Sequence, residues 1–308
     1  MNLSVVLCTY NRAALLSRAL QSLEAVAVPA GLAWELLVVD NNSTDGTRAV
    51  VEAAAARRVL PCRYVFEPRQ GKSHALNTGL AETTGDVIAF TDDDVTFDSG
   101  WLAALWRGFD DPDCLGLGGR IVAVWSQPKP SWYAEQGPYR LMMAIVRYEY
   151  GEQPIPAPQP PYGANMAYRR AAFQRYGGFD PSLGPSARTL MRGEDTEFGR
   201  RVLAAGGRVR YQPDAIVYHP VEPARLRRGY FRAFYYHYGR MEVRTEAPDG
   251  SAVHWFGVPR HLFRSLAAHG GRSVIALDPQ RRFYHQLESA RVAGQIVESY
   301  RRAHGAAS

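Results

Sequence analysis

The chain has 308 residues, of which 46% are hydrophobic and 21% are charged, proportions that are ordinary for a globular protein. No apolar stretch approaches the roughly 18 residues that a membrane-spanning helix needs, and the N-terminal residues have a strand pattern without a basic region, so we expect no secretory signal. The net charge is +6, and the arginines are dispersed without a recognition motif, which argues against a nucleic-acid partner. The three cysteines lack paired spacing, which argues against disulfides and a zinc site and indicates a reducing, cytoplasmic setting.

The first 120 residues alternate between patterns typical of strands and patterns typical of helices. Continuous apolar runs predict strands that are buried on both faces, and apolar residues at helical spacing predict the helices between them. The predicted strands are residues 3–10, 34–40, 62–68 and 86–90. Residues 43–58 predict a turn that enters a helix, and residues 72–85 predict another helix. Asn11 is the expected N-cap of the first helix. This alternation predicts a parallel, doubly wound α/β sheet.

Polar clusters follow three of these strands, at residues 9–12, 40–45 and 92–94. Ligands of parallel α/β sheets bind outside the carboxyl ends of the strands, so we expect the clusters to converge there. The last cluster is three adjacent aspartates, which repel one another. A Mg²⁺ or Mn²⁺ ion would relieve this repulsion and bridge a nucleotide diphosphate. The alternative is an acidic turn that caps the next helix, near Trp101.

The character of the sequence changes after residue 120. Residues 151–163 are too rich in proline for a helix or a central strand and predict a long surface loop. A short strand, a helix that stops at Gly177, a helix with an acidic first turn and an extended segment follow. The last stretch, 221–308, carries helical patterns rich in arginine and aromatic residues.

Six segments, taken together and in this order, resemble the motifs of glycosyltransferase family 2. They are SVVLCTYNR, LLVVDNNSTDGT, GKSHALNTGL, FTDDDV, GANMAYRRAAFQRYGGFD and GEDTEFGRR. The resemblance implies an A-type glycosyltransferase fold, with a Rossmann-like, mostly parallel sheet flanked by helices, and an inverting mechanism. The expected organisation is a nucleotide-sugar-binding half over 1–120, an acceptor-binding and catalytic-base half of the same domain over 121–220, and a C-terminal helical extension over 221–308.

The resemblance also implies roles for residues that bind the nucleotide sugar. Asp40 would accept a hydrogen bond from the ring N–H of the base, usually uracil, which favours UDP over GDP or dTDP. The other expected donor-binding residues are Thr9, Tyr10 and Arg12 around the base and ribose, and Arg69 or Lys72 at the pyrophosphate.

The aspartate triplet matches the DxD motif of the family. Asp92 and Asp94 occupy its outer positions and Asp93 its middle position, among the donor-binding residues. Asp94 is the preferred ligand of the divalent cation, Mn²⁺ or Mg²⁺. For His219 two interpretations stay open, a further metal or phosphate contact and a histidine packed at a strand end.

Sugar transfer also needs a base, because the acceptor hydroxyl must lose its proton during attack. Asp195, with Glu194 beside it, matches the acidic pair of the family, and its alternative role is to cap the helix that begins there. The acceptor is expected to be a glycan or a lipid-linked acceptor. The expected acceptor-binding residues are Trp125 and Trp132, whose flat rings suit sugar faces, and Asn165 and Met166.

Residues 225–240 form a basic, aromatic helix pattern with two interpretations. Its aromatic face would either pack on the catalytic domain or lie on an anionic membrane surface, as a peripheral protein of the inner membrane face would. Two other functions compete with sugar transfer: a non-catalytic protein that binds sugars or nucleotides, and a sugar nucleotidyltransferase. The second normally has a glycine-rich phosphate loop after the first strand, where this sequence has none.

Overall fold

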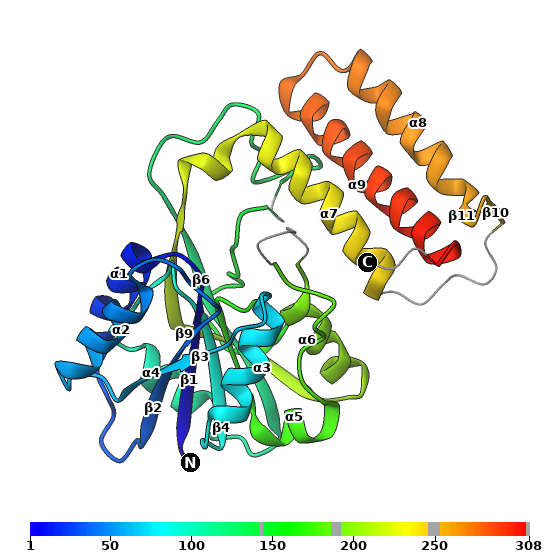
Figure 1. Ribbon diagram of the computed structural model, residues 1–308. Helices are drawn as coiled ribbons and strands as arrows, with labels where there is room; N and C mark the ends of the chain where they lie inside the picture. The colour runs from blue at the N-terminus through cyan, green and yellow to red at the C-terminus, as the bar shows by residue number, and fades with distance from the viewer. Residues whose placement is uncertain (142–143, 186–191, 246–252, 306–308) are drawn as a thin grey trace. The chain divides into compact units, whose positions relative to one another are not determined.

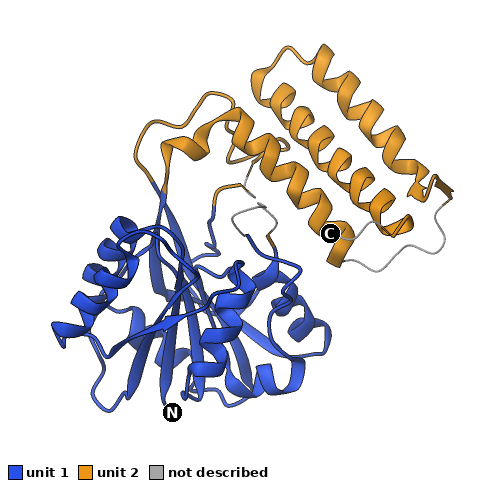
Figure 2. Cartoon of the chain, in the orientation of Figure 1, with its two compact units in different colours: residues 1–124, 146–188, 193–220 blue, residues 125–145, 189–192, 221–308 orange. Residues whose placement is uncertain are grey.

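The computed structural model describes residues 1–141, 144–185, 192–245 and 253–305. The chain divides into two compact units, which Figure 2 colours differently. Unit 1 consists of residues 1–124, 146–188 and 193–220, and unit 2 of residues 125–145, 189–192 and 221–308.

Unit 1 is built on one mixed sheet (Figure 1). In the described residues its strand order is β3-β2-β1-β4-β8-β6-β9-β5, with β7 paired to β9. The first four strands are parallel, as the sequence predicts, and β8 runs antiparallel to β4. The strands are β1 (Leu3–Thr9), β2 (Trp34–Asp40), β3 (Cys62–Phe66), β4 (Val87–Asp92), β5 (Thr96–Phe97), β6 (Cys114–Trp125), β7 (Ile155–Pro156), β8 (Asn165–Arg169) and β9 (Arg208–Val221).

Helices cover both faces of this sheet, because successive residues of each strand point to opposite sides. In β1, Val5 packs in one core with helices α1, α2 and α4, whereas Val6 packs in the other with α3, α5 and α6. The predicted doubly wound architecture is therefore confirmed. The helices are α1 (Ala13–Glu24), α2 (Thr47–Ala56), α3 (Lys72–Glu82), α4 (Trp101–Gly108), α5 (Arg170–Tyr176) and α6 (Glu194–Ala204).

The predicted N-cap of the first helix is wrong. Helix α1 begins at Ala13, and Asn11 has a φ of 51°, outside the helix. The side-chain oxygen of Asn11 instead accepts a hydrogen bond from the backbone N–H of Thr44, and a carboxylate oxygen of Asp45 accepts one from Ala13. The first turn of α1 is thus capped by the loop after β2, a contact between segments that local sequence does not reveal.

Unit 2 consists mainly of helices, as predicted for the C-terminal stretch. Helix α9 packs against both α7 and α8 (Figure 1). The elements are a 3₁₀ helix (Pro223–Leu226), α7 (Arg228–Thr245), β10 (His254–Trp255), β11 (Val258–Pro259), α8 (Arg260–Ile275) and α9 (Pro279–Ala303). No helix in the described ranges is both long enough and apolar enough to cross a membrane.

The aromatic face of α7 packs inside unit 2. Phe231 and Tyr235 are 0% and 2% exposed, and the ring of Phe231 lies 5.1 Å from that of Trp132 and 6.2 Å from that of Phe283. These two side chains are therefore packed, but the neighbours of Phe231 belong to unit 2 and not to the catalytic domain that the packing interpretation named. Phe234 is only partly buried.

Two glycines allow the backbones of α7 and α9 to approach closely. A methyl group on Gly239 would lie 1.9 Å from the carbonyl oxygen of Arg291, and one on Gly294 would lie 2.0 Å from that of Tyr236. Carbon atoms cannot approach backbone oxygens so closely without displacing a helix. These two positions therefore set the separation of the helices.

We expect Gly239→Ala to lower the free energy of unfolding by about 2 kcal/mol, because overpacking at a backbone contact outweighs the better helix propensity of alanine. Gly271→Ala is the matched control, since Gly271 of α8 is exposed with no atom within 4 Å of an added methyl group. This control should raise stability by roughly 0.5–1 kcal/mol. Urea unfolding measures both changes, and equal effects would contradict the assigned contact.

Candidate active site

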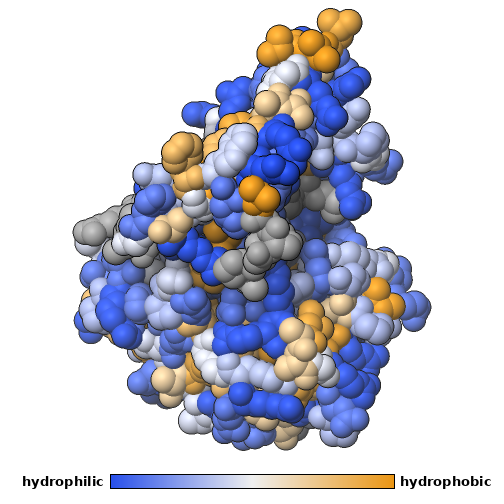
Figure 3. Space-filling model, turned by 90° about the vertical axis from the view of Figure 1, so that its right-hand side faces the viewer, coloured by the Kyte–Doolittle hydropathy of each residue, from blue (hydrophilic) through white to orange (hydrophobic). Residues whose placement is uncertain are grey.

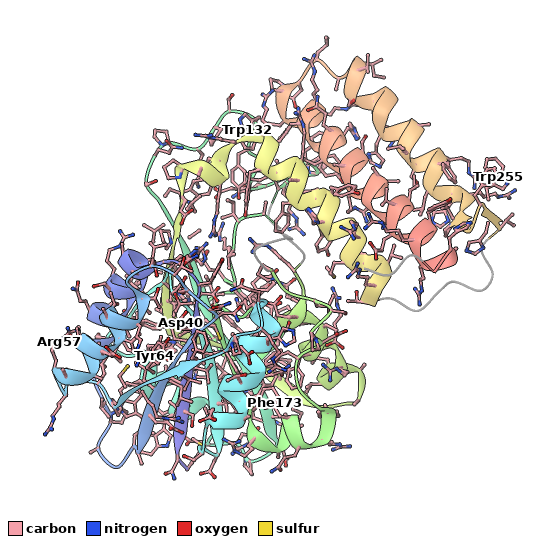
Figure 4. The ribbon with its side chains drawn as sticks, viewed as in Figure 1. Asp40, Arg57, Tyr64, Trp132, Phe173 and Trp255 are labelled. Atoms are coloured by element: carbon pink, nitrogen blue, oxygen red, sulfur yellow. The ribbon has the colours of Figure 1, made fainter. Side chains whose placement is uncertain are left out.

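The polar residues predicted to converge do so at the carboxyl edge of the sheet in unit 1. Thr9 is paired with Asp40 across β1 and β2, and Cys8 with Asp92 across β1 and β4. The chain leaves the sheet at these positions, so three loops open at one edge. Figure 4 labels Asp40 there.

A possible metal site lies at the end of β4. Asp92, Asp94 and His219 each offer a ligand atom, and these atoms lie within 4.8 Å of one another. His219 comes from β9, is 4% exposed, and has its Nε2 atom 3.4 Å from Asp94 Oδ1. Carboxylate oxygens with one imidazole nitrogen are a donor set that suits Mn²⁺.

Cations from two other segments compensate the aspartate triplet. Lys72 Nζ lies 2.6 Å from Asp92 Oδ1, and the Arg12 guanidinium lies 3.1 Å from Asp93 and 3.1 Å from Asp94. The Thr9 hydroxyl donates a hydrogen bond of 2.7 Å to Asp93. Burial raises the pKa of Asp93 to about 6 although Arg12 opposes this shift. The middle aspartate is therefore held by protein groups.

The acidic pair at the start of α6 divides into a buried and an accessible member. Glu194 is 3% exposed, lies 3.7 Å from Lys72 Nζ, and burial followed by the charge of Asp195 raises its pKa to about 7. Asp195 is half-buried, and its Oδ2 accepts a hydrogen bond of 2.6 Å from the Gly163 N–H. A methyl group on Gly163 would lie 3.3 Å from both this oxygen and Lys72 Nζ, so Asp195 adjoins the aspartate triplet.

Asp40 is buried and already bonded within the protein. Its Oδ1 accepts a hydrogen bond from the Ser43 N–H at 2.9 Å, and its Oδ2 accepts one from the Tyr64 hydroxyl at 2.8 Å. Burial, followed by the hydrogen bond to Asp40, raises the pKa of Tyr64 to about 12. A carboxylate has about four lone-pair positions, so two remain for a ligand. The strand pattern of residues 62–68 gave no sign that Tyr64 would bind Asp40.

Of the two predicted pyrophosphate contacts, only Lys72 reaches the carboxylates. Arg69 forms a two-pronged pair with Glu67, with both nitrogen-to-oxygen distances 2.8 Å, and its side chain is 65% exposed. This hydrogen bonding lowers the pKa of the buried Glu67 to about 2. Asn41 fixes the same loop by accepting a hydrogen bond from the Gly71 N–H. Tyr10, the remaining predicted donor-binding residue, is 36% exposed at the end of β1.

Comparison with known proteins identifies the family of the chain. The profile described as Glycosyl transferase family 2 matches residues 4–177, more than half of the chain. The succinoglycan biosynthesis protein ExoM of Rhizobium meliloti is 31% identical over 222 residues, which cover 72% of this chain and 67% of ExoM. The chain belongs to glycosyltransferase family 2.

One further relative is similar in sequence, and one solved structure is similar in fold. The glucosyl-dolichyl phosphate glucuronosyltransferase of Haloferax volcanii is 27% identical over 256 residues, covering 82% of this chain and 80% of that protein. The mannosyltransferase PcManGT from Pyrobaculum calidifontis, solved with GDP-Man and Mn²⁺, has a TM-score of 0.58 at 23% identity, covering 99% of this chain and 76% of that one. The protein is therefore a glycosyltransferase with the A-type fold, and the two competing functions are set aside.

Within this glycosyltransferase, Asn165 and Met166 lie in the interior of unit 1. Asn165 is 1% exposed, and all of its side-chain bonding is internal: it accepts from Trp101 Nε1 at 2.9 Å and donates to the carbonyl oxygens of Arg120 and Ala215. Met166 is part of the core beneath α3, α5 and α6. We therefore do not retain either residue in the proposed acceptor site.

The two predicted acceptor tryptophans belong to unit 2 and make their contacts there. Trp132 is 8% exposed, with its ring 4.7 Å from that of Phe283. Trp125 lies 5.1 Å from the ring of Tyr133, and the Lys129 ammonium sits 5.0 Å from the Trp125 ring. Trp132 therefore has a packing role, whereas Trp125, which is only partly buried, stays a predicted sugar contact.

The substitution Asn165→Ala tests whether the hydrogen bonds of Asn165 stabilise the interior of unit 1. Removing this amide leaves the Trp101 N–H and two carbonyl groups without their partner, so we expect the free energy of unfolding to fall by about 3 kcal/mol. Asn2→Ala, at an exposed position, is the control and should change it by less than about 0.5 kcal/mol. Urea denaturation measures both. A residue that only bound acceptor would leave stability unchanged.

Proposed function

We propose that this glycosyltransferase moves a sugar from a nucleotide-diphosphate sugar to a hydroxyl of a glycan or lipid-linked acceptor, with a divalent cation and with inversion at the anomeric carbon. The observation that supports the proposal most strongly is the grouping of Asp92, Asp94 and His219 beside Lys72. The names of two relatives agree with such acceptors, since one refers to succinoglycan and the other to a dolichyl phosphate.

The charges around this group fit a divalent cation. Five carboxyl groups, from residues 92–94 and 194–195, have two neighbouring Lys or Arg cations among the residues that the structure describes, Lys72 and Arg12. Asp94, Asp92 and His219 would hold Mn²⁺ or Mg²⁺. When bound, such an ion supplies a Lewis acid that stabilises the charge developing on the diphosphate leaving group. PcManGT, which has the same fold, was solved with Mn²⁺.

The protein's own cations would support the same leaving group. Lys72 Nζ sits between Asp92 and Glu194, and the buried Glu194 holds this ammonium in place from the side of α6. Carboxylates keep the pKa of Lys72 above its usual value despite burial, so the side chain stays charged. Arg12 would contribute a second positive charge at the nucleotide, and its bonds to Asp93 and Asp94 fix where that charge lies.

The nucleotide base would bind at Asp40. Oxygen acceptors of a carboxylate suit the ring N–H of uracil, and the hydroxyl of Tyr64 and the N–H of Ser43 keep that carboxylate in position. Tyr10, exposed at the end of the neighbouring strand, offers a ring face for the base or ribose. These groups together favour UDP.

Asp195 would act as the base. Its carboxylate is accessible and is oriented by the Gly163 N–H, whereas Glu194 is buried against Lys72. As the acceptor oxygen attacks the anomeric carbon, its proton passes to an Asp195 oxygen. The bond to the diphosphate breaks on the opposite face of the sugar, which inverts the anomeric centre without a covalent enzyme intermediate.

A thermal-shift measurement tests the donor site. UDP, GDP and dTDP are each added with Mn²⁺, Mg²⁺ or EDTA, and we expect UDP with Mn²⁺ to stabilise the protein. A ligand at 100 times its Kd contributes about 2.7 kcal/mol. Asp94→Asn should abolish the shift, whereas Asp110→Asn, an exposed aspartate at the end of α4, should retain it. No nucleotide response with any cation would contradict the proposal.

The substitution Asp195→Asn tests the role of the base separately from binding of the donor. The asparagine retains an oxygen for the Gly163 N–H but cannot take up a proton, so we expect kcat to fall by about 10²–10⁴-fold while UDP binding is unchanged. Glu197→Gln, two residues further along α6 and paired with Arg201, is the matched control and should keep most of its activity. Activity can be followed as UDP release. An Asp195→Asn enzyme of normal kcat would assign the base elsewhere.

A further inference from the structure

Helix α8 ends in an exposed apolar tip. Val274, Ile275 and Leu277, at the turn from α8 to α9, are 80%, 73% and 90% exposed. Figure 3 shows apolar side chains gathered at the end of unit 2 where these helices meet. Three neighbouring aliphatic side chains in water are unfavourable unless a partner covers them.

A second apolar group lies at the other end of α8. Trp255 and Phe256, in the hairpin of β10 and β11, are 56% and 82% exposed, and Val253 before them is 53% exposed. Figure 4 labels Trp255 at this hairpin. Tryptophan favours the boundary between water and apolar phases, because its ring is apolar and its N–H is polar.

The face of α8 between these two groups is basic. Arg260, Arg264 and Arg272 are exposed, and residues 260–275 contain no acidic side chain. None of the three arginines forms an ion pair with a residue in the described ranges. At 100° per residue, Arg260, Arg264 and Ile275 fall on one side of the helix.

The opposite side of α8 is the one that packs on α9. Leu262, with Phe263 and Leu266, joins Val292 and Ile296 of α9 in a small core. The basic face therefore points away from the rest of unit 2.

The charge of the protein is concentrated in this unit. Unit 2 has 17 Lys and Arg against 8 Asp and Glu, a net charge of +9, whereas unit 1 has 19 against 22, a net charge of −3. The overall value of +6 hides this division. An anionic partner would be attracted to unit 2.

We propose that the outer face of α8 docks on an anionic lipid bilayer. Ile275 and Leu277, at the end of α8, enter the boundary between headgroups and acyl chains, while Arg260 and Arg264 bind lipid phosphates. Apolar residues combined with unpaired arginines are what such a surface accepts. A second copy of the chain would bring the same arginines against each other, which like charges oppose.

This docking surface is not the one that the sequence pattern of residues 225–240 suggested. In that segment Phe231 and Tyr235 are buried. It does not depend on the proposed reaction, and its test uses no sugar nucleotide. A transferase held at a bilayer would meet lipid-linked acceptors there.

The test is co-sedimentation of the full chain with vesicles of phosphatidylcholine, with and without phosphatidylglycerol. We expect binding only when phosphatidylglycerol is present, weakening as salt is raised. Leu277→Asp should lower the affinity at least about tenfold, and Arg264→Gln about fivefold. The matched controls are Val59→Asp and Arg58→Gln in unit 1, where Val59 is 58% exposed and Arg58 is exposed. Both controls should bind as the unchanged protein does.

Three results would overturn the proposal: no binding to either vesicle, equal loss in the controls, or equal binding to both lipid compositions. All substituted positions are exposed, and thermal unfolding checks that each variant is folded. Size-exclusion chromatography with light scattering measures whether a second copy of the chain binds this surface instead. A dimer that Leu277→Asp converts to a monomer, with vesicle binding unaffected, would assign the surface to a second copy.

Discussion

The mutual repulsion of three adjacent aspartates is the constraint on which the rest of unit 1 depends. Each aspartate lies beside a cation from another segment, with Lys72 at the start of α3 and Arg12 in the loop before α1. The side chains of Asp93 and Asp94 are 6% and 4% exposed, so losing Arg12 would leave poorly compensated buried charge. These pairs therefore fix the two loops against the end of β4, and the same Lys72 contact extends to Glu194 at the start of α6. Neutralising the charge of the aspartate triplet thus positions four segments: the two loops, the end of β4 and the start of α6.

Those positions also explain why the two acidic residues of α6 differ. Glu194 is the first residue of the helix, after the N-cap Gly193, and points into the interior, towards Lys72. The next residue along a helix is rotated by about 100°, so Asp195 turns towards the Gly163 N–H and remains accessible. A residue that receives a proton from a substrate must be reachable, and a residue that holds a cation benefits from burial. One helical step separates the two roles.

Sequence patterns predicted those parts of the structure that depend on residues close together in the chain. Apolar runs predicted the four parallel strands, and the rule that ligands bind at strand ends predicted that Asp40 and the aspartate triplet would meet. The family resemblance was needed for His219, which comes from a strand far along the chain. Arg69 could not be placed from sequence, because Glu67, two residues before it, competes for the guanidinium. The internal hydrogen bonds of Asn165 could not be predicted for a similar reason, since its partners are two backbone carbonyls and a tryptophan from other elements.

The arginines of unit 2 show why net charge alone was a poor guide to partners. Three of those in α7 and α9 face inward: Arg240 and Arg244 both pair with the buried Glu298, and Arg291 pairs with Glu242. Their charges hold the two helices together around the glycine contact, and pairing lowers the pKa of Glu298 despite its burial. Helix α8 contains neither a glycine held at such a contact nor an acidic partner. Its arginines contribute nothing to the packing of the unit, so their charge is available to a partner outside the protein.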